Sequence, residues 1–98
     1  MTIAEMEARL LALPALIAKD EVEYKRVKSI ADAGELEISL ATVTTGKDAD
    51  TRKMERENAV LKNDLQCEAM LGAANAEAKY HALVREYDAI TTILRRGA

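Results

Sequence analysis

The sequence contains no Phe and no Trp, one cysteine (Cys67) and one proline (Pro14). A lone cysteine excludes a disulfide-bonded scaffold. No apolar run approaches the roughly 18 residues that cross a membrane. A formal net charge of −3 argues against a strongly basic nucleic-acid-binding protein. The N-terminus has no basic region followed by an apolar core, so no signal peptide is visible and we expect a cytoplasmic protein.

The residues that are abundant favour helices. Ala, Leu, Glu, Lys, Arg and Met make up most of the chain, and these are strong helix formers. Hydrophobic residues account for 49% of the sequence, far more than in a disordered chain. The one β-branched cluster, at residues 42–45, runs directly into Gly46 and indicates the end of a helix. The sequence therefore predicts an all-α protein.

The first helical arm is predicted over about residues 2–45. Thr2 and Glu5 have the spacing of a capping box, in which each residue satisfies a free N–H at the helix start. Pro14 lacks an N–H and clashes with the preceding turn, so the arm is either kinked or broken there. Apolar or small residues recur every three or four positions along one face, with Asp20 as the one charged residue in this register: Ile3, Met6, Leu10, Leu13 and Ile17, then Tyr24, Val27, Ala31, Gly34, Ile38 and Ala41.

The second arm is predicted as one helix over about residues 49–96, after a turn at 46–48. Gly46 is expected to close the first helix in the left-handed conformation, and Asp48 to cap the second. The expected contact positions of this arm are Met54, Leu61, Leu65, Ala69, Ala73, Ala76, Tyr80, Leu83, Tyr87, Ile90 and Leu94. A short turn makes neighbouring helices antiparallel, so residues 1–98 are predicted to form a single helical hairpin with coiled-coil-like arms.

Folding the chain at Gly46 predicts which residues meet across the hairpin. Tyr24 is expected near the small residues at 69–73, and Tyr80 and Tyr87 beside the stretch 3–13. Several apolar residues fall outside this contact: Leu11, Leu16, Ile30, Leu36, Leu40, Val60, Leu71 and Val84. A monomer rarely exposes so long an apolar strip. We therefore expect a homodimer or higher oligomer that forms a four-helix or larger bundle, although a helix of another protein is an alternative cover.

No group of residues predicts catalysis, a metal site or a cofactor. Cys67 and His81, the only soft metal ligands, lie fourteen positions apart on one predicted helix and cannot meet within one chain. No strand–turn–helix surrounds any candidate nucleophile. The sequence predicts a protein that is not an enzyme.

Basic residues gather in two places and are the candidate partner or nucleic-acid contacts. The first is mid-arm and the second surrounds the predicted turn: Tyr24, Lys25, Arg26 and Lys28, then Lys47, Arg52, Lys53 and Arg56. Lys and Arg side chains in such clusters can grip phosphates. Interleaved acidic residues weaken the field, and a solvated mixed-charge face is the usual meaning of this pattern.

The segment from Thr45 to Lys53, with the opening motif Glu7-Ala8-Arg9-Leu10 and the later Leu13-Pro14 pair, resembles small bacteriophage and prophage proteins. In those proteins a Gly-Lys-Asn-Ala turn precedes an Arg-Lys pair, and this chain has Asp48 in place of the Asn. The resemblance implies a phage origin, a helical hairpin and an accessory or anti-host-defence role in the host cytoplasm. The predicted function is binding of a host or phage protein, and the alternative is an accessory role on nucleic acid in phage replication or recombination.

Overall fold

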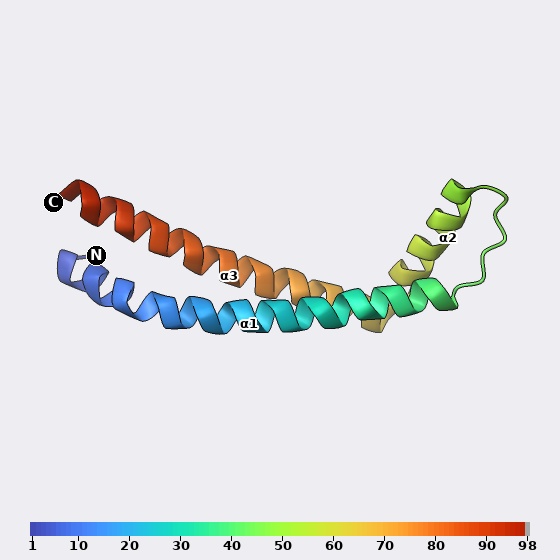
Figure 1. The fold of residues 1–98 in the computed structure, drawn as a ribbon, viewed down its shortest axis with the longest axis horizontal. Coiled ribbons are helices and arrows are strands. Elements are labelled where there is room, and N and C mark those ends of the chain that lie inside the picture. The colour runs from blue at the N-terminus through green and yellow to red at the C-terminus, as the bar shows by residue number, and fades with distance from the viewer. Residues whose placement is uncertain (98) are drawn as a thin grey trace. The chain divides into compact units, whose positions relative to one another are not determined.

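The computed structural model describes residues 1–97, and the prediction of an all-α protein is confirmed. The helices are α1 (Ile3–Ala41), α2 (Ala49–Leu61) and α3 (Asp64–Gly97), with no strand among the described residues (Figure 1). Contacts divide the chain into two compact units. Unit 1 contains Met1–Lys25 and the segment from Asn75 onwards, and unit 2 contains Arg26–Ala74.

The start of α1 follows the predicted capping box in part. The Glu5 N–H donates to the Thr2 hydroxyl at 3.1 Å, which satisfies one of the free donors of the first turn. The Glu5 carboxylate accepts from the Thr2 hydroxyl at 3.1 Å. The cap of α1 is therefore formed by the two side chains that the sequence singled out.

Pro14 lies inside α1, and the helix continues through it as far as Ala41. Of the two outcomes left open by the sequence, a break at Pro14 is wrong. Proline has no N–H, so the carbonyl of Leu10 loses its usual partner one turn earlier. The apolar spacing continues in phase on both sides, because Leu13 and Ile17 contact the same cluster. Packing on both sides of the proline keeps the segment helical.

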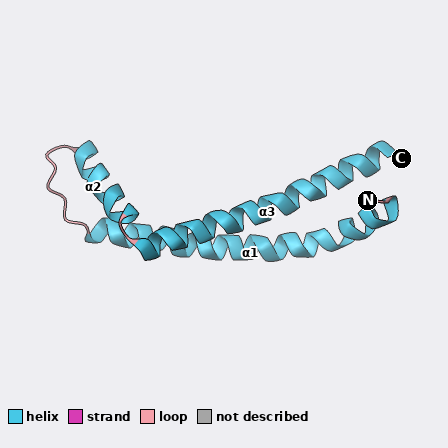
Figure 2. Cartoon of the chain, turned by 180° about the vertical axis from the view of Figure 1, so that it is seen from behind, coloured by secondary structure: helices cyan, strands magenta, loops and turns pink. Residues whose placement is uncertain are grey.

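The core of unit 1 lies between the N-terminal part of α1 and the C-terminal part of α3, which lie side by side in Figures 1 and 2. Met6, Leu13 and Ile90 are buried, and Leu13 is completely inaccessible. Partly buried apolar residues surround them: Leu10, Ile17, Leu83, Tyr87 and Leu94. The predicted apolar face of the first arm is thus the buried face in this unit, except at Ile3, which is 62% exposed.

The connection between α1 and α2 is longer than the predicted turn at 46–48, because α1 ends at Ala41. The Thr42 N–H and the Thr42 hydroxyl both donate to the Ile38 carbonyl, at 3.0 and 2.7 Å. The Thr45 N–H donates to the Glu55 carboxylate at 2.8 Å, which ties the connection to α2. β-branched residues are weak helix formers, so these side-chain bonds replace the last helical turn that we predicted.

The expectation of a left-handed Gly46 is wrong, because no glycine among the described residues has a positive φ. Gly46 is instead required by close packing. A Cβ atom at this position would lie 2.5 Å from Cγ2 of Thr51 and 2.8 Å from its Cβ. The Arg52 guanidinium also donates to the carbonyls of Gly46 and Lys47, at 3.5 and 3.4 Å. The start of α2 therefore packs directly onto the backbone at Gly46.

Asp48 caps α2 as predicted, but the second arm is not one helix. The Asp48 carboxylate accepts from the Thr51 N–H at 2.7 Å, and this bond lowers the pKa of Asp48. The helix stops at Leu61, and α3 begins at Asp64. Asn63 causes the restart, because its side-chain oxygen accepts from the Gln66 N–H at 2.9 Å in the manner of a helix N-cap.

Unit 2 is organised around a buried polar side chain. Gln66 is 6% exposed, and its amide donates to the Ala31 carbonyl of α1 at 2.7 Å. Its amide oxygen lies where a Cβ of Gly34 would be, so the glycine makes room for it. Ala31 and Val60 are the buried apolar residues of this unit.

The interruption at Lys62 and Asn63 corrects the predicted register of the second arm. Met54, Leu61 and Leu65 are exposed, although we expected them at the contact. Val60 is buried instead, although we placed it outside the contact. Periodicity counted through 49–96 assumes one helix, and the two nonhelical residues shift the phase.

The tyrosine contacts in unit 1 also differ from those that the predicted register gives. Tyr24 stacks on Tyr80 with ring centroids 5.9 Å apart, whereas we expected it near the small residues at 69–73. The placement of Tyr80 beside residues 3–13 is therefore wrong. Tyr87 does pack against the core formed by Met6, Leu13 and Ile90, as predicted.

Candidate interaction surfaces

Two ion pairs connect α1 to α3 in unit 1. Arg9 donates to both oxygens of Glu86, at 2.7 Å from Nε and 3.0 Å from Nη2. The paired hydrogen bonds raise the pKa of Arg9 and lower the pKa of Glu86. Lys79 Nζ lies 3.8 Å from Oδ1 of Asp20. The second contact is long, and the buried Oδ2 of Asp20 has no hydrogen-bond partner.

An aromatic cluster is formed by Tyr24, Tyr80 and His81, next to Lys79 in the sequence. His81 is exposed and lies 5.4 Å from the Tyr80 ring and 6.4 Å from the Tyr24 ring, between centroids. The two tyrosine rings are nearly parallel, with an angle of 17° between their planes. Stacked rings contribute packing and orientation, and nothing in the cluster supplies a nucleophile for His81.

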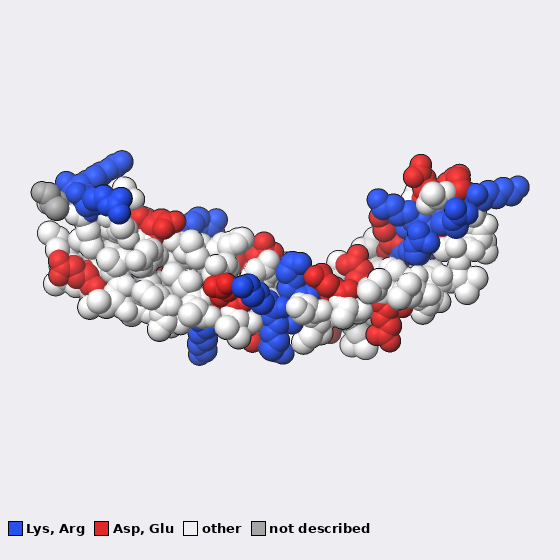
Figure 3. All heavy atoms as spheres, viewed as in Figure 1, with Lys and Arg blue, Asp and Glu red and all other residues white. Residues whose placement is uncertain are grey.

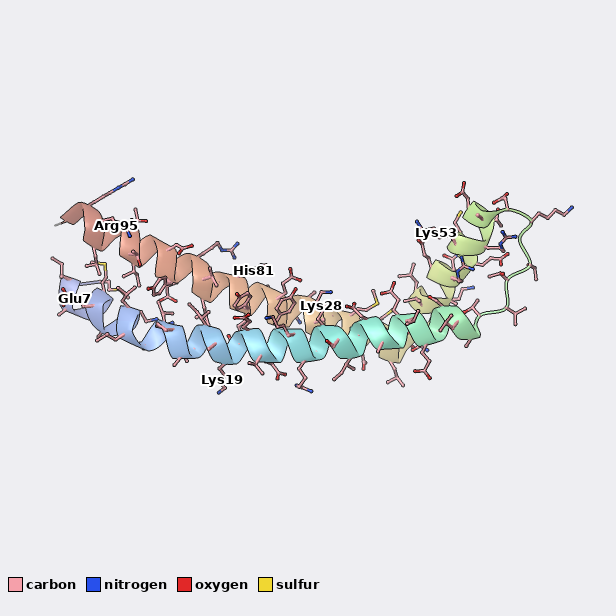
Figure 4. The ribbon with its side chains drawn as sticks, in the orientation of Figure 1. Glu7, Lys19, Lys28, Lys53, His81 and Arg95 are labelled. Carbon is pink, nitrogen blue, oxygen red and sulfur yellow. The ribbon has the colours of Figure 1, made fainter. Side chains whose placement is uncertain are left out.

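An apolar cleft of about 410 Å³ lies at the terminal end of unit 1. It is lined by Ile3, Met6, Glu7, Ile93, Leu94 and Gly97. Ile3 is 62% exposed and Ile93 is 53% exposed, although both carry large apolar side chains. Glu7 is the one charged residue in this lining, and it is labelled in Figure 4. The cleft can take an apolar side chain.

A smaller hollow in unit 2 has a wholly apolar lining. Val27 and Ile30 of α1 face Ala69 and Gly72 of α3 across about 160 Å³. Gly72 lies in the middle of α3, and a Cβ built there meets nothing within 4 Å. Mid-helix glycine costs about 1 kcal/mol relative to alanine, and no contact in this chain requires it.

Large apolar side chains are also exposed along both units. In unit 1, Leu11 is 85% exposed and Val22 is 69% exposed. In unit 2 the exposed set includes Ile30, Leu36, Leu40, Val43, Leu61, Leu65 and Leu71. The predicted surplus of apolar surface is therefore present at Leu11, Leu16, Ile30, Leu36, Leu40 and Leu71. Val84 is half-buried, and Val60 is buried.

The mid-arm basic candidates fall in both units. Tyr24 is half-buried in its stack, and Lys25 donates to Glu21 at 2.7 Å, a bond that raises the pKa of Lys25. In unit 2, Lys28 donates to Asp32 at 2.9 Å. Arg26 also belongs to unit 2 and is exposed. The described pairs of Lys25 and Lys28 neutralise much of the charge in this stretch.

The basic candidates near α2 are all in unit 2. Arg52 bonds to the backbone at Gly46 and Lys47, while the Lys47 side chain is exposed. Lys53 lies 3.9 Å from Glu57, and Arg56 is half-buried. Figure 3 shows acidic and basic side chains interleaved over this region. The structure thus brings Arg52 to the connection and places Lys53 near one carboxylate, that of Glu57.

The Cys67 thiol lies against the backbone at the end of α2. Its thiol lies 3.4 Å from the Leu61 carbonyl and 3.7 Å from the Val60 carbonyl, both at the end of α2. The Val60 carbonyl already accepts from the Asn63 N–H at 3.1 Å, and a thiol is a weak donor that can add to the hydrogen bonding at the end of a helix. Within residues 1–97, no three His, Cys, Asp or Glu side chains are grouped so that they could hold a metal ion. None of the described helices is long and apolar enough to cross a membrane.

Comparisons with models of known protein families, with curated proteins and with solved structures gave no match.

Proposed function

We propose that this chain is a non-enzymatic helical protein that associates with itself and acts by binding another protein. The observation that carries the proposal is the exposure of large apolar side chains in both units. Leu11, Leu40 and Leu65 are each about four-fifths exposed or more, with values of 85%, 79% and 79%. A single exposed leucine needs no explanation, whereas contiguous apolar patches on a soluble protein mark interaction sites.

The exposed apolar side chains also indicate how association would be stabilised. Burying apolar area contributes about 25 cal/mol per Å². Covering exposed leucines such as Leu11, Leu40 and Leu65 by a second copy or another protein would therefore be favourable.

The proposed assembly is built from antiparallel helical hairpins. In unit 1, Arg9 pairs with Glu86 and Asp20 with Lys79, so residue numbers fall along α3 as they rise along α1. This order is that of two antiparallel helices. We propose that the whole chain follows this arrangement and that two hairpins form a bundle, since twofold dimers are the commonest oligomers.

The resemblance of the 45–53 segment to phage proteins supports a biological setting for this binding. We propose an accessory or anti-defence protein of phage origin that meets its partner in the host cytoplasm. A nucleic-acid role has less support, because Lys25, Lys28 and Lys53 have carboxylate neighbours at 2.7, 2.9 and 3.9 Å.

Two measurements test the proposal. Light scattering at micromolar concentration is expected to give a multiple of the 10.8 kDa monomer mass. Titration with single- and double-stranded nucleic acid at low and moderate salt is expected to show weak binding. A helical monomer in the first experiment would contradict self-association. Tight binding with a steep salt dependence in the second would favour the nucleic-acid function.

A further inference from the structure

The face of α1 that points away from the unit 1 core carries its own apolar pattern. Ala4, Ala8, Leu11, Ala15, Ala18 and Val22 follow one another at alternating steps of four and three residues. All six are exposed. This spacing is that of the contact positions of a coiled coil. We name these six residues the outer face of α1.

The core residues lie on the other side of the helix. Met6 and Leu13, which face α3, occupy the position of the seven-residue repeat opposite to the outer face. Lys19 flanks the outer face, and Figure 4 shows its side chain directed away from α3. α1 thus has two apolar faces in unit 1, of which one is buried within the chain.

We propose that the outer face of α1 packs against the same face of a second copy, with the two α1 helices antiparallel. This proposal rests on the self-association proposed above and specifies its contact. One alignment pairs all six residues with each other: Ala4 with Val22, Ala8 with Ala18 and Leu11 with Ala15 of the partner. In each pair at least one member is alanine. Leu11 and Val22 therefore each meet an alanine, Ala8 meets Ala18, and the helices can approach closely.

Other antiparallel alignments are less favourable. A shift of one repeat in one direction places Lys25 opposite Ala8. A shift in the other direction pairs residues 4–15 only and leaves Val22 uncovered. A charged side chain in an apolar contact is costly unless it is paired. The alignment that uses the whole outer face is therefore the one that the sequence favours.

The charges that flank the outer face are compatible with this alignment. Along one edge, Glu5 of each copy lies opposite Lys19 of the other, which gives two attractive pairs by symmetry. Along the other edge, Glu7 lies opposite Glu21. Glu21 is already bound by Lys25 at 2.7 Å, which brings a compensating positive charge to that edge. The Glu5–Lys19 pairs also favour the antiparallel direction of the two α1 helices, because a parallel alignment would not bring Glu5 close to Lys19 of the other copy.

Cross-linking tests the direction of the contact. In a Cys67→Ser background, which removes the one native thiol, Ala12→Cys and Ala4→Cys are compared with a bis-maleimide that has a two-carbon spacer. In the proposed contact, Ala12 of one chain lies next to Ala12 of the second copy, beside the twofold axis that relates the two α1 helices. The two Ala4 residues are separated by about 27 Å in the antiparallel contact, at 1.5 Å for each of 18 residues. We expect Ala12→Cys to cross-link into dimers at least ten-fold faster than Ala4→Cys.

A charge exchange provides an independent measurement. Lys19→Glu is expected to raise the dimer dissociation constant about ten-fold, since it turns two attractive pairs into repulsive ones. The combination of Glu5→Lys with Lys19→Glu is expected to restore the affinity. Lys47→Glu, on the exposed connection of unit 2, is the matched control and is expected to leave the dimer unchanged. Circular dichroism verifies that each variant keeps its helical content.

The outcomes separate this contact from self-association in general. Faster cross-linking through Ala4 would mean a parallel contact and would overturn the proposal. No cross-linking at either position, from a protein that still scatters as a multimer, would overturn this contact and leave the proposed self-association standing. A monomer in light scattering would overturn both.

Discussion

Gly34 and Gly72 both lie within helices of unit 2, yet replacing them by alanine should change stability in opposite directions. In a helix interior, alanine is favoured over glycine by about 1 kcal/mol. At Gly72 a Cβ meets nothing within 4 Å in the chain, so the full gain of about 1 kcal/mol is expected. At Gly34 the same atom would overlap the amide oxygen of Gln66 and lie 3.1 Å from its Cδ.

The loss of stability expected for Gly34→Ala comes from displacing the Gln66 side chain. Gln66 is 6% exposed and donates to the Ala31 carbonyl at 2.7 Å, so moving it breaks a buried hydrogen bond. Leaving a buried amide without a partner costs about 1–3 kcal/mol. After the helix-propensity gain, Gly34→Ala should be neutral to destabilising by about 2 kcal/mol. The two alanine variants should therefore differ by about 1–3 kcal/mol.

Urea denaturation followed by circular dichroism, at one fixed protein concentration, measures both changes. A third variant isolates the cause. In a Gln66→Ala background the obstacle is absent, so Gly34→Ala should become stabilising by about 1 kcal/mol, like Gly72→Ala. Equal stabilisation at both glycines in the native background would refute the assigned packing of Gln66 against Gly34.

Three further predictions concern other parts of the chain. Leu13→Ala, which truncates a completely buried side chain, should lower the free energy of unfolding by about 2–5 kcal/mol in urea denaturation, and a loss below 1 kcal/mol would contradict the unit 1 core. Gly46→Ala and Gly46→Asn should both lower the melting temperature, because a Cβ atom at this position overlaps Thr51. An Asn variant with an unchanged melting temperature would contradict this packing and would support the left-handed Gly46 that the sequence predicts. In the folded chain the hydrogen bonds from Arg9 lower the pKa of Glu86 below its ordinary value of 4.5. The pair therefore stabilises the folded state fully at a pH above 4.5, and this contribution is lost as the pH falls through the lowered pKa. Glu86→Gln should accordingly reduce the acid dependence of stability, and an unchanged pH profile would show that the pair does not contribute.

The helical class and the buried face of α1 were predictable, because both depend on local pattern. Thr2 and Asp48 have the side chains that cap helices, and both do so. Met6 and Leu13 have helical spacing and are buried. Continuity through Pro14 could not be derived from the proline alone, since it depends on packing of the residues before and after it.

The restart at Asn63 was missed, although the sequence carries its signal. Asn63 precedes Gln66 by three residues, the same spacing as Thr2 and Glu5. The surrounding residues continue a helical pattern, so apolar periodicity alone predicts one uninterrupted helix across Asn63. Gln66 itself could not be identified as a core residue, because its burial depends on a glycine 32 positions earlier, at Gly34. Such a long-range fit is not encoded in local spacing.

The outer face of α1 and the apolar hollow belong to different units of the chain. The outer face of α1, from Ala4 to Val22, belongs to unit 1. The apolar hollow at Val27, Ile30, Ala69 and Gly72 belongs to unit 2. If the first surface serves self-association, the second remains for a different protein, and its mid-helix glycine has a reason in the close approach of a partner side chain. Self-association and partner binding should then be separable, since a charge at Leu11 disturbs a contact in unit 1 and leaves the lining of the unit 2 hollow intact.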